Sequence, residues 1–131
     1  MDVITSHTNA DFDSLASMLA ARKLYKEAIP VFSGAQERNV RVFFSKVPEE
    51  KFGIEKIRNI DLNKITRLII VDVKTPDRLG RFAGILNRPD LKIHVYDHHP
   101  HTEKDIHGEM EVIEPAGATT TILIEKLIEN K

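Results

Sequence analysis

The most informative segment of the chain for its fold is Leu68-Ile69-Ile70-Val71-Asp72. Four consecutive aliphatic residues without polar alternation are typical of a strand that is buried on both faces of a parallel sheet. An aspartate follows directly, and functional sites of open parallel sheets lie at the carboxyl ends of the strands. The stretch therefore predicts a central buried strand with a functional carboxylate, Asp72, at its end.

Alternating strand and helix signals extend outward from this stretch on both sides. Further strands are expected at residues 3–5, 31–32, 93–96 and 110–113, and helices at 14–26, at 77–86 and from Gly117 onward. Residues 36–45 fit a helix or a strand, and residues 46–62 give no clear pattern. The alternation predicts a three-layer α/β/α domain with a mostly parallel five-stranded sheet.

The composition narrows the class of protein. A chain of 131 residues with 41% hydrophobic residues can form one domain with a sizeable core. Its net charge of -1 gives no support to broad electrostatic binding of nucleic acid, and the lack of Trp weakens the case for base stacking. The lack of Cys rules out disulfides and thiolate metal sites. No apolar stretch could span a membrane and no signal peptide is evident, so a cytoplasmic protein is expected.

Acidic and histidine side chains follow three of the expected strands. The first strand leads into His7, Asp11 and Asp13, the central strand into Asp72, and the strand at 93–96 into Asp97-His98-His99. Each group alone is commonly a helix cap, a turn or a solvated loop. Together they converge on one rim of the sheet, where carboxylates without a cation would repel one another. Imidazole and carboxylate ligands suit Mn or Mg, and also Zn or Fe.

This set of side chains predicts a two-metal centre for phosphate-ester hydrolysis. Asp11 and Asp13 stand two residues apart and can serve different ions, whereas Asp72 can bridge them. Other polar residues have weaker claims. His94 is expected to be structural, and His101 and His107 are expected to be exposed. A solvated face is favoured over phosphate contact for Arg38, Arg41 and Lys46. The run Gly117-Ala118-Thr119-Thr120 fits either an anion site or a simple helix start.

These motifs resemble the DHH phosphoesterase superfamily. The matching text runs from His7 to Ser14, continues with Asp72 and Asp97-His98-His99-Pro100, and ends at Gly117 to Thr120. The resemblance implies two divalent ions, with Mn preferred and Mg possible. It assigns His7, Asp11 and Asp72 to one ion, and Asp13, Asp72 and His98 to the other. It also implies that Asp97 supports these metal-binding side chains and that His99 contacts the scissile phosphate. Thr119 and Gly117 would lie beside the substrate.

One departure from the family pattern concerns the end of the chain. Members of the superfamily usually supply a further Asp to the second metal from a strand after the last helix, and they carry a separate substrate-binding domain. This chain ends at Lys131 within that helix, so residues 1–131 are expected to be a truncated N-terminal DHH domain. The second metal site would then be incomplete, unless Asp105 or a carboxylate of a partner chain substitutes.

The stretch Val31 to Val40 is similar to one subgroup, in which a DHH domain precedes CBS domains and a tRNA nucleotidyltransferase or poly(A) polymerase domain. The leading hypothesis is a metal-dependent phosphoesterase acting on phosphodiester or phosphoanhydride bonds of RNA ends, nucleotides or related compounds. The expected partners are a phosphate-containing small molecule or short RNA and the downstream domains. A homodimer is compatible, and no membrane is involved. The alternatives are a non-catalytic sensor or RNA-positioning module, and a plain α/β interaction domain.

Overall fold

The computed structural model describes residues 1–130, and Lys131 lies outside the described residues. All five strands pair in parallel, in the order β2-β1-β3-β4-β5. Their bounds are β1 (Asp2–Thr5), β2 (Ile29–Pro30), β3 (Arg67–Val71), β4 (Lys92–Asp97) and β5 (Met110–Ile113). The predicted central strand is confirmed, because β3 lies in the middle and Leu68 to Val71 are fully buried.

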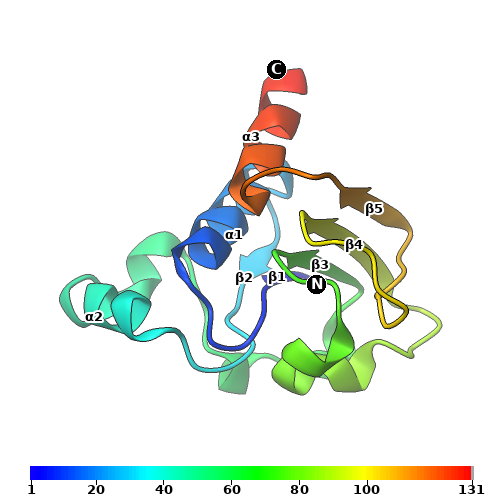
Figure 1. Cartoon of the computed structure of the whole chain (residues 1–131). Coiled ribbons are helices and arrows are strands. Elements are labelled where there is room, and N and C mark those ends of the chain that lie inside the picture. The colour runs from blue at the N-terminus through cyan, green and yellow to red at the C-terminus, as the bar shows by residue number, and fades with distance from the viewer. Residues whose placement is uncertain (131) are drawn as a thin grey trace.

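Two hydrophobic clusters cover the two faces of the sheet, as the three-layer prediction requires. Ile69 and Val71 of β3 pack on one face against Met18 and Leu123, which come from α1 (Phe12–Leu24) and α3 (Thr119–Glu129). Leu68 and Ile70 face the other side, since successive strand residues point in opposite directions. Figure 1 shows α3 projecting from the body at the top of the view and α2 (Arg38–Lys46) at its left edge.

The second face is covered by short 3₁₀ helices. These are η2 (Ile57–Asn59), η3 (Leu62–Lys64), η4 (Pro76–Arg78) and η5 (Gly80–Ile85), of which η5 contributes buried Phe82. The expected helix at 77–86 is therefore two shorter pieces. Gly80 begins the second piece with φ of 53°, and a side chain there would collide with the carbonyl oxygen of Ser33. A further 3₁₀ helix, η1 (Glu49–Phe52), lies on the first face, where Phe52 packs against the cluster of α1.

Two other elements differ in detail from the expectations. Residues 36–45 fitted either a helix or a strand, and most of them belong to α2, which begins at Arg38. The second strand lies at Ile29–Pro30, and Val31 makes only an isolated bridge to Glu55. Pro30 has no N–H to donate, which is tolerated because β2 is an edge strand. None of the helices among residues 1–130 combines the length and apolar character that a membrane crossing needs.

The strand order places three loops at the same rim. Thr5 of β1 is paired with Ile70 of β3, and Val71 is paired with Tyr96 of β4. These three strands are neighbours and run in the same direction, so the residues that follow them emerge together. The loops after β1, β3 and β4 carry the side chains that were singled out in the sequence.

Candidate metal centre

The loop after β1 supplies a buried imidazole in a defined tautomer. Nδ1 of His7 lies 2.7 Å from the carbonyl oxygen of Thr8, so we assign its N–H to that bond. In the neutral ring Nε2 then carries a lone pair, and in the protonated ring its N–H faces the same oxygens, Oγ of Ser14 at 2.8 Å and Oδ2 of Asp72 at 3.4 Å. A backbone carbonyl that fixes the far nitrogen is the usual arrangement of a metal-binding histidine.

Asp72 follows β3 in an unusual backbone conformation. Its φ is 62°, in the left-handed region that few residues other than Gly, Asn and Asp adopt. The carboxylate accepts hydrogen bonds from the hydroxyls of Ser14 (3.0 Å) and Thr119 (3.0 Å). Burial acts to raise the pKa of Asp72, but the hydrogen bonds, led by that with His7, outweigh it and lower the pKa to about 2. Asp72 is therefore a buried anion at neutral pH.

The contact between His7 and Asp72 also changes the pKa of His7. Burial acts to lower the pKa of the imidazole, whereas its bonds with Asp72 and the carbonyl of Thr8 raise it, and the net effect is a raised pKa. The cluster of carboxylates thus attracts positive charge to this position. A cation that binds Nε2 would replace a proton there.

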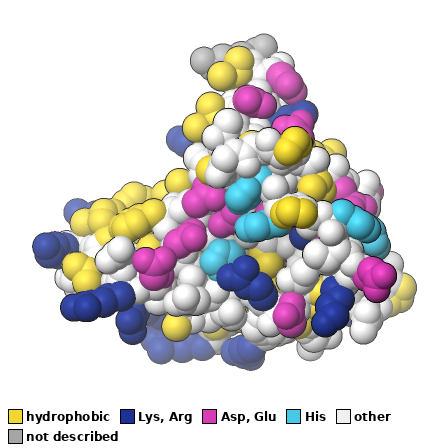
Figure 2. Space-filling view, in the orientation of Figure 1, with side chains coloured by type: hydrophobic (Ala, Val, Ile, Leu, Met, Phe, Trp, Pro, Cys, Tyr) yellow, Lys and Arg dark blue, Asp and Glu magenta, His cyan; other side chains and the backbone are white. Residues whose placement is uncertain are grey.

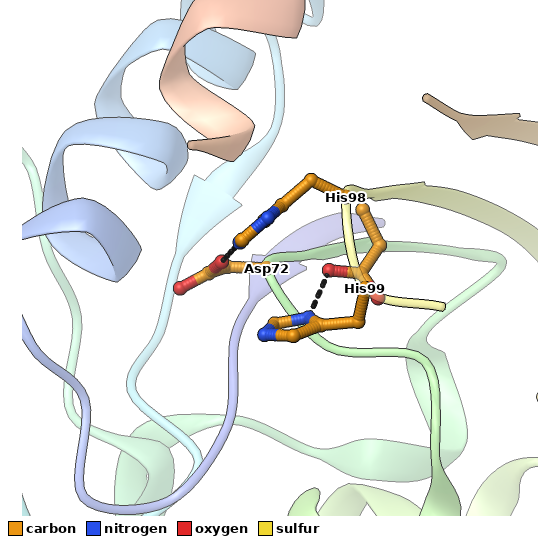
Figure 3. A group of neighbouring side chains, drawn as sticks. Asp72, His98 and His99 are labelled. Carbon is orange, nitrogen blue, oxygen red and sulfur yellow. Dashed lines mark hydrogen bonds and ion pairs between the residues drawn. The ribbon is translucent and has the colours of Figure 1, made fainter. Parts of the chain in front are cut away.

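Asp97 ends β4 and orients His99. It is fully buried, and its Oδ1 lies 2.6 Å from Nδ1 of His99. Its Oδ2 is one of three buried side-chain polar atoms without a hydrogen-bond partner among the described residues. His98 turns the other way, with Nε2 3.3 Å from Oδ1 of Asp72. Figure 3 shows both imidazoles reaching toward the space beside Asp72.

These side chains form two overlapping sets of possible metal ligands. Each set offers one oxygen or nitrogen atom per residue, and those atoms lie within 4.8 Å of one another. The sets are His7, Asp11 and Asp72, and Asp72, Asp97, His98 and His99. Both sets contain Asp72, and the donors are imidazole nitrogens and carboxylate oxygens, the types that hold Mn or Mg. The donor chemistry and the unpartnered Oδ2 of Asp97 fit a divalent cation.

Asp13 lies in the same cavity but has protein partners. Its carboxylate accepts hydrogen bonds from the backbone N–H groups of Thr119 (3.3 Å) and Thr120 (3.2 Å) and from the Thr120 hydroxyl (2.6 Å). It therefore caps α3, whereas Asp11 caps α1 through the N–H of Ser14 (2.9 Å). Among the described residues, Asp13 falls outside both ligand sets.

A cavity of about 360 Å³ opens over the two sets. Its lining brings together His7, Asp11, Asp13, Asp72, His98, His99, Gly117 and Ala118 with Arg78. Nearly every predicted site residue thus meets at one place. The exceptions lie at its edge: Thr119 and Asp97 are completely buried, and both act through hydrogen bonds to their neighbours. Figure 2 shows histidine and acidic side chains gathered in the middle of this face.

Two residues of the site were missed in the sequence. Ser14 was noted only as the end of the first motif and was given no role in the site, yet its Oγ lies within 3.0 Å of Asp11 Oδ1, Asp72 Oδ2 and His7 Nε2. Arg78 places Nη2 3.2 Å from Nδ1 of His7. Arg78 follows Asp72 by six residues, within a segment that was expected to be an ordinary helix, and no motif pointed to it. Ser14 could have been found, because it occurs one helical turn after Asp11.

The remaining polar residues have roles outside the ligand sets. Asp105 was an alternative ligand, but its Oδ2 lies 3.2 Å from Nζ of buried Lys74, and it accepts hydrogen bonds from Thr102. His94 is structural as predicted, since it is buried and bonds Tyr25 and Glu109. His101 and His107 are exposed as predicted, and so are Arg38, Arg41 and Lys46 of α2.

A curated protein and two solved structures are similar to this chain. An A-adding tRNA nucleotidyltransferase of Geobacter sulfurreducens is 46% identical over 129 residues. The match covers 98% of this chain and 15% of that protein, so the chain spans only a small part of its length. An exopolyphosphatase-related protein from Bacteroides fragilis has a TM-score of 0.75 at 18% identity, over 98% of this chain and 39% of that one.

A putative family II inorganic pyrophosphatase from Methanococcus jannaschii has a TM-score of 0.70 at 22% identity, over 99% of this chain and 40% of that one. At such identities, the two structures demonstrate a common fold. The family model described as "DHH family, N-terminal domain" matches residues 3–131. The match therefore confirms the resemblance that the motifs indicated: the chain belongs to the DHH family and represents its N-terminal domain.

Proposed function

We propose that this DHH domain is a divalent-metal-dependent phosphoesterase, which hydrolyses phosphodiester or phosphoanhydride bonds of RNA ends, nucleotides or related compounds. The observation that carries the proposal is the position of Asp72, which belongs to both sets of possible ligands. A carboxylate shared between two ions is the arrangement that a two-metal phosphoesterase requires. The low pKa of Asp72, about 2, keeps this group ionised at neutral pH.

In this proposal His7, Asp11 and Asp72 hold one Mn or Mg ion. Asp72 and His98 hold the other, with Asp13 and Asp97 beside it. When bound, such ions stabilise negative charge on phosphoryl oxygens and ease the ionisation of water. The hydroxyls of Ser14 and Thr119 fix the orientation of the shared carboxylate. Because those hydroxyls are held in place by α1 and α3, the two helices set the geometry of the centre.

His99 is proposed to contact the scissile phosphate. Asp97 holds its Nδ1, which leaves Nε2 available to a substrate oxygen. Arg78 lines the same cavity and adds a permanent positive charge beside the carboxylates. Gly117 lines the cavity just before α3, and no other atom lies within 4 Å of the place where its side chain would stand, so it leaves room for a substrate. Together these residues would bind and orient a phosphate that lies against the carboxylate cluster.

The test is the effect of Asp72→Asn on Mn-dependent hydrolysis of bis-p-nitrophenyl phosphate. Asparagine tolerates the left-handed conformation, so the backbone should be retained. We expect kcat to fall by at least about 100-fold, because both ligand sets lose a charged oxygen. Glu27→Gln, at an exposed position without a hydrogen-bond partner among the described residues, is the matched control. Equal rates for the two variants would contradict the assignment.

A second candidate function is a non-catalytic sensor or RNA-positioning module. The observation that favours it is the engagement of Asp13 with α3, which leaves fewer groups for a second ion. The similar Geobacter protein is named as a tRNA nucleotidyltransferase, and we propose a comparable setting with further domains for this one. Calorimetric titration with Mn separates the candidates: two ions per chain support catalysis, whereas one or none supports the sensor.

A further inference from the structure

The part of the surface that the proposed function leaves unused is a basic groove. A cavity of about 500 Å³ lies between the second half of α1 and η1. Its lining consists of Leu19, Arg22, Lys23, Lys26, Lys51 and Phe52. Four of these six residues are cations, and the described lining contains no carboxylate. The groove therefore combines a positive rim with an apolar floor, although the net charge of the whole chain is only -1.

One cation of the groove is fixed in place. Nη1 of Arg22 donates a hydrogen bond of 2.9 Å to the carbonyl oxygen of Phe52. The guanidinium lies against Gly53, where any side chain would overlap it, and the φ of 71° at Gly53 is a conformation that glycine adopts readily. The remaining N–H donors of Arg22 are thus held ready for an anion. Lys23, Lys26 and Lys51 are exposed around it.

Aromatic rings connect this groove with the metal centre. Phe12 stands between Asp11 and Asp13 at the start of α1, and 47% of it is exposed. Its ring packs edge-on against Phe43 of α2 at 6.0 Å, and Phe43 lies 5.9 Å from Phe52 in the groove. Figure 2 shows hydrophobic side chains over the flank that contains α2, beside the acidic and histidine side chains of the centre.

We propose that this surface is the track of a single-stranded nucleic acid, whose end reaches the metal centre and whose phosphates further along occupy the basic groove. The proposal rests on the proposed function and specifies its substrate class. Exposed aromatic rings stack on bases of any sequence, and lysines alongside them neutralise phosphates. From Phe12 to Lys23 the helix rises about 16 Å. A ligand that uses both ends must be a polymer of several nucleotides, so pyrophosphate is too short.

The test measures binding of a fluorescein-labelled oligoadenylate of roughly 12 nucleotides by fluorescence anisotropy. The variant is Lys23→Gln/Lys26→Gln/Lys51→Gln, and the matched control is Lys56→Gln/Lys64→Gln/Lys92→Gln, three exposed lysines outside the groove. We expect the groove variant to bind about tenfold more weakly at low salt, with a salt slope reduced by about two. The control should bind like the unchanged protein.

The outcomes separate this inference from the proposed function. Hydrolysis of bis-p-nitrophenyl phosphate should be unchanged in the groove variant, because this small substrate does not reach the lysines. If the groove variant and the control bind the oligonucleotide equally, or the unchanged protein does not bind it, the track is wrong. If polyglutamate of equal charge competes as well as RNA, the groove is a site for acidic peptides and the inference fails. If binding depends on the groove but no phosphodiester is cleaved, the inference stands and the proposed function fails.

The stacking step has its own test at Phe12. Phe12→Ala should weaken oligonucleotide binding about tenfold, and Phe12→Tyr should restore it, because tyrosine keeps the aromatic face. The ring is half-exposed, so both variants should fold, and thermal melting checks this. Equal affinities of the alanine and tyrosine variants would show that Phe12 does not stack on a base, and would remove the aromatic part of the track.

Discussion

At the scale of a single residue, Asp97 is a buried carboxylate whose two oxygens have different surroundings. Its carboxylate is completely buried, one oxygen is hydrogen-bonded to His99, and the other has no partner among the described residues. Burying an ionised group without compensation is costly. A cation beside Oδ2 would provide the compensation, which accounts for an otherwise unfavourable arrangement.

Asp97→Asn tests the part that Asp97 plays through His99. An amide can still meet the imidazole, but it removes the charge that holds the Nδ1–H tautomer. We expect activity to fall by about 10- to 100-fold. His94, which bonds Tyr25 and Glu109 away from the centre, offers the control substitution His94→Gln. Activity of Asp97→Asn equal to that of the control would contradict the positioning role.

At the scale of elements, Asp13 joins α1 to α3. Its carboxylate satisfies the free N–H groups at the start of α3, where a negative charge is also favoured by the helix dipole. Asp13→Ala should lower the free energy of unfolding by about 1 kcal/mol even with excess chelator. Urea denaturation measures this, with Glu125→Ala on the exposed face of α3 as control. A loss of stability seen only with metal would assign Asp13 to the cation alone.

The loop after the Asp97-His98-His99 run is fastened by a buried ion pair. Lys74 and Asp105 are each 5% exposed at the side chain, and Nζ lies 3.2 Å from Oδ2. The N–H of Ile106 also donates to the carbonyl oxygen of Lys74 at 2.6 Å. Lys74 follows Asp72 by two residues, so the pair connects the end of β3 with the loop that carries the histidines.

Asp105 should make stability depend on pH in the acid range. Burial acts to raise the pKa of Asp105, but hydrogen bonds from Thr102 and the contact with Lys74 lower it to about 2. A lowered pKa gives stability that is present above about pH 4 and is lost as the pH falls toward 2. Asp105→Asn should flatten this part of the curve of unfolding free energy against pH. An unaltered curve would contradict the assignment.

The same variant should be destabilised at neutral pH, by about 3 kcal/mol, because Lys74 is left buried without a carboxylate. The matched double variant Lys74→Met/Asp105→Leu removes both charges and should recover most of this loss. Equal destabilisation of the single and double variants would indicate that packing, and not the unpaired charge, dominates.

At the scale of the whole molecule, a bound cation should stabilise the fold. The centre is built from loops after three strands, so an ion that binds only the folded chain shifts the unfolding equilibrium. Mn at about 100 times its Kd contributes about 2.7 kcal/mol, which raises Tm by about 10 °C for a domain of this size. Asp72→Asn should show less than half of this rise. A Tm that chelator leaves unchanged in Mn-loaded protein would contradict a metal centre.

The regular parts of the fold were predictable because local patterns specify them. The aliphatic run before Asp72 defined β3, residues 110–113 were confirmed as β5, and the strand at 93–96 was confirmed with one more residue at each end. The helices at 14–26 and from Gly117 were confirmed with shifted ends. The short connections were less predictable, since the break of the segment at 77–86 into two 3₁₀ pieces coincides with the close approach of Gly80 to the carbonyl oxygen of Ser33, a tertiary contact.

The parallel sheet and the residue types of the centre were predictable from local patterns, because periodicity and the position of a residue after a strand depend only on local order. The hydrogen-bond partners of these residues became known only from the packed fold. It brought Ser14 and Thr119 to Asp72, engaged Asp13 with α3 and Asp105 with Lys74, and placed Arg78 beside His7. A carboxylate accepts hydrogen bonds from the donors that the packing of helices on the sheet brings within about 3 Å. That packing depends on the whole chain and cannot be predicted from any single motif.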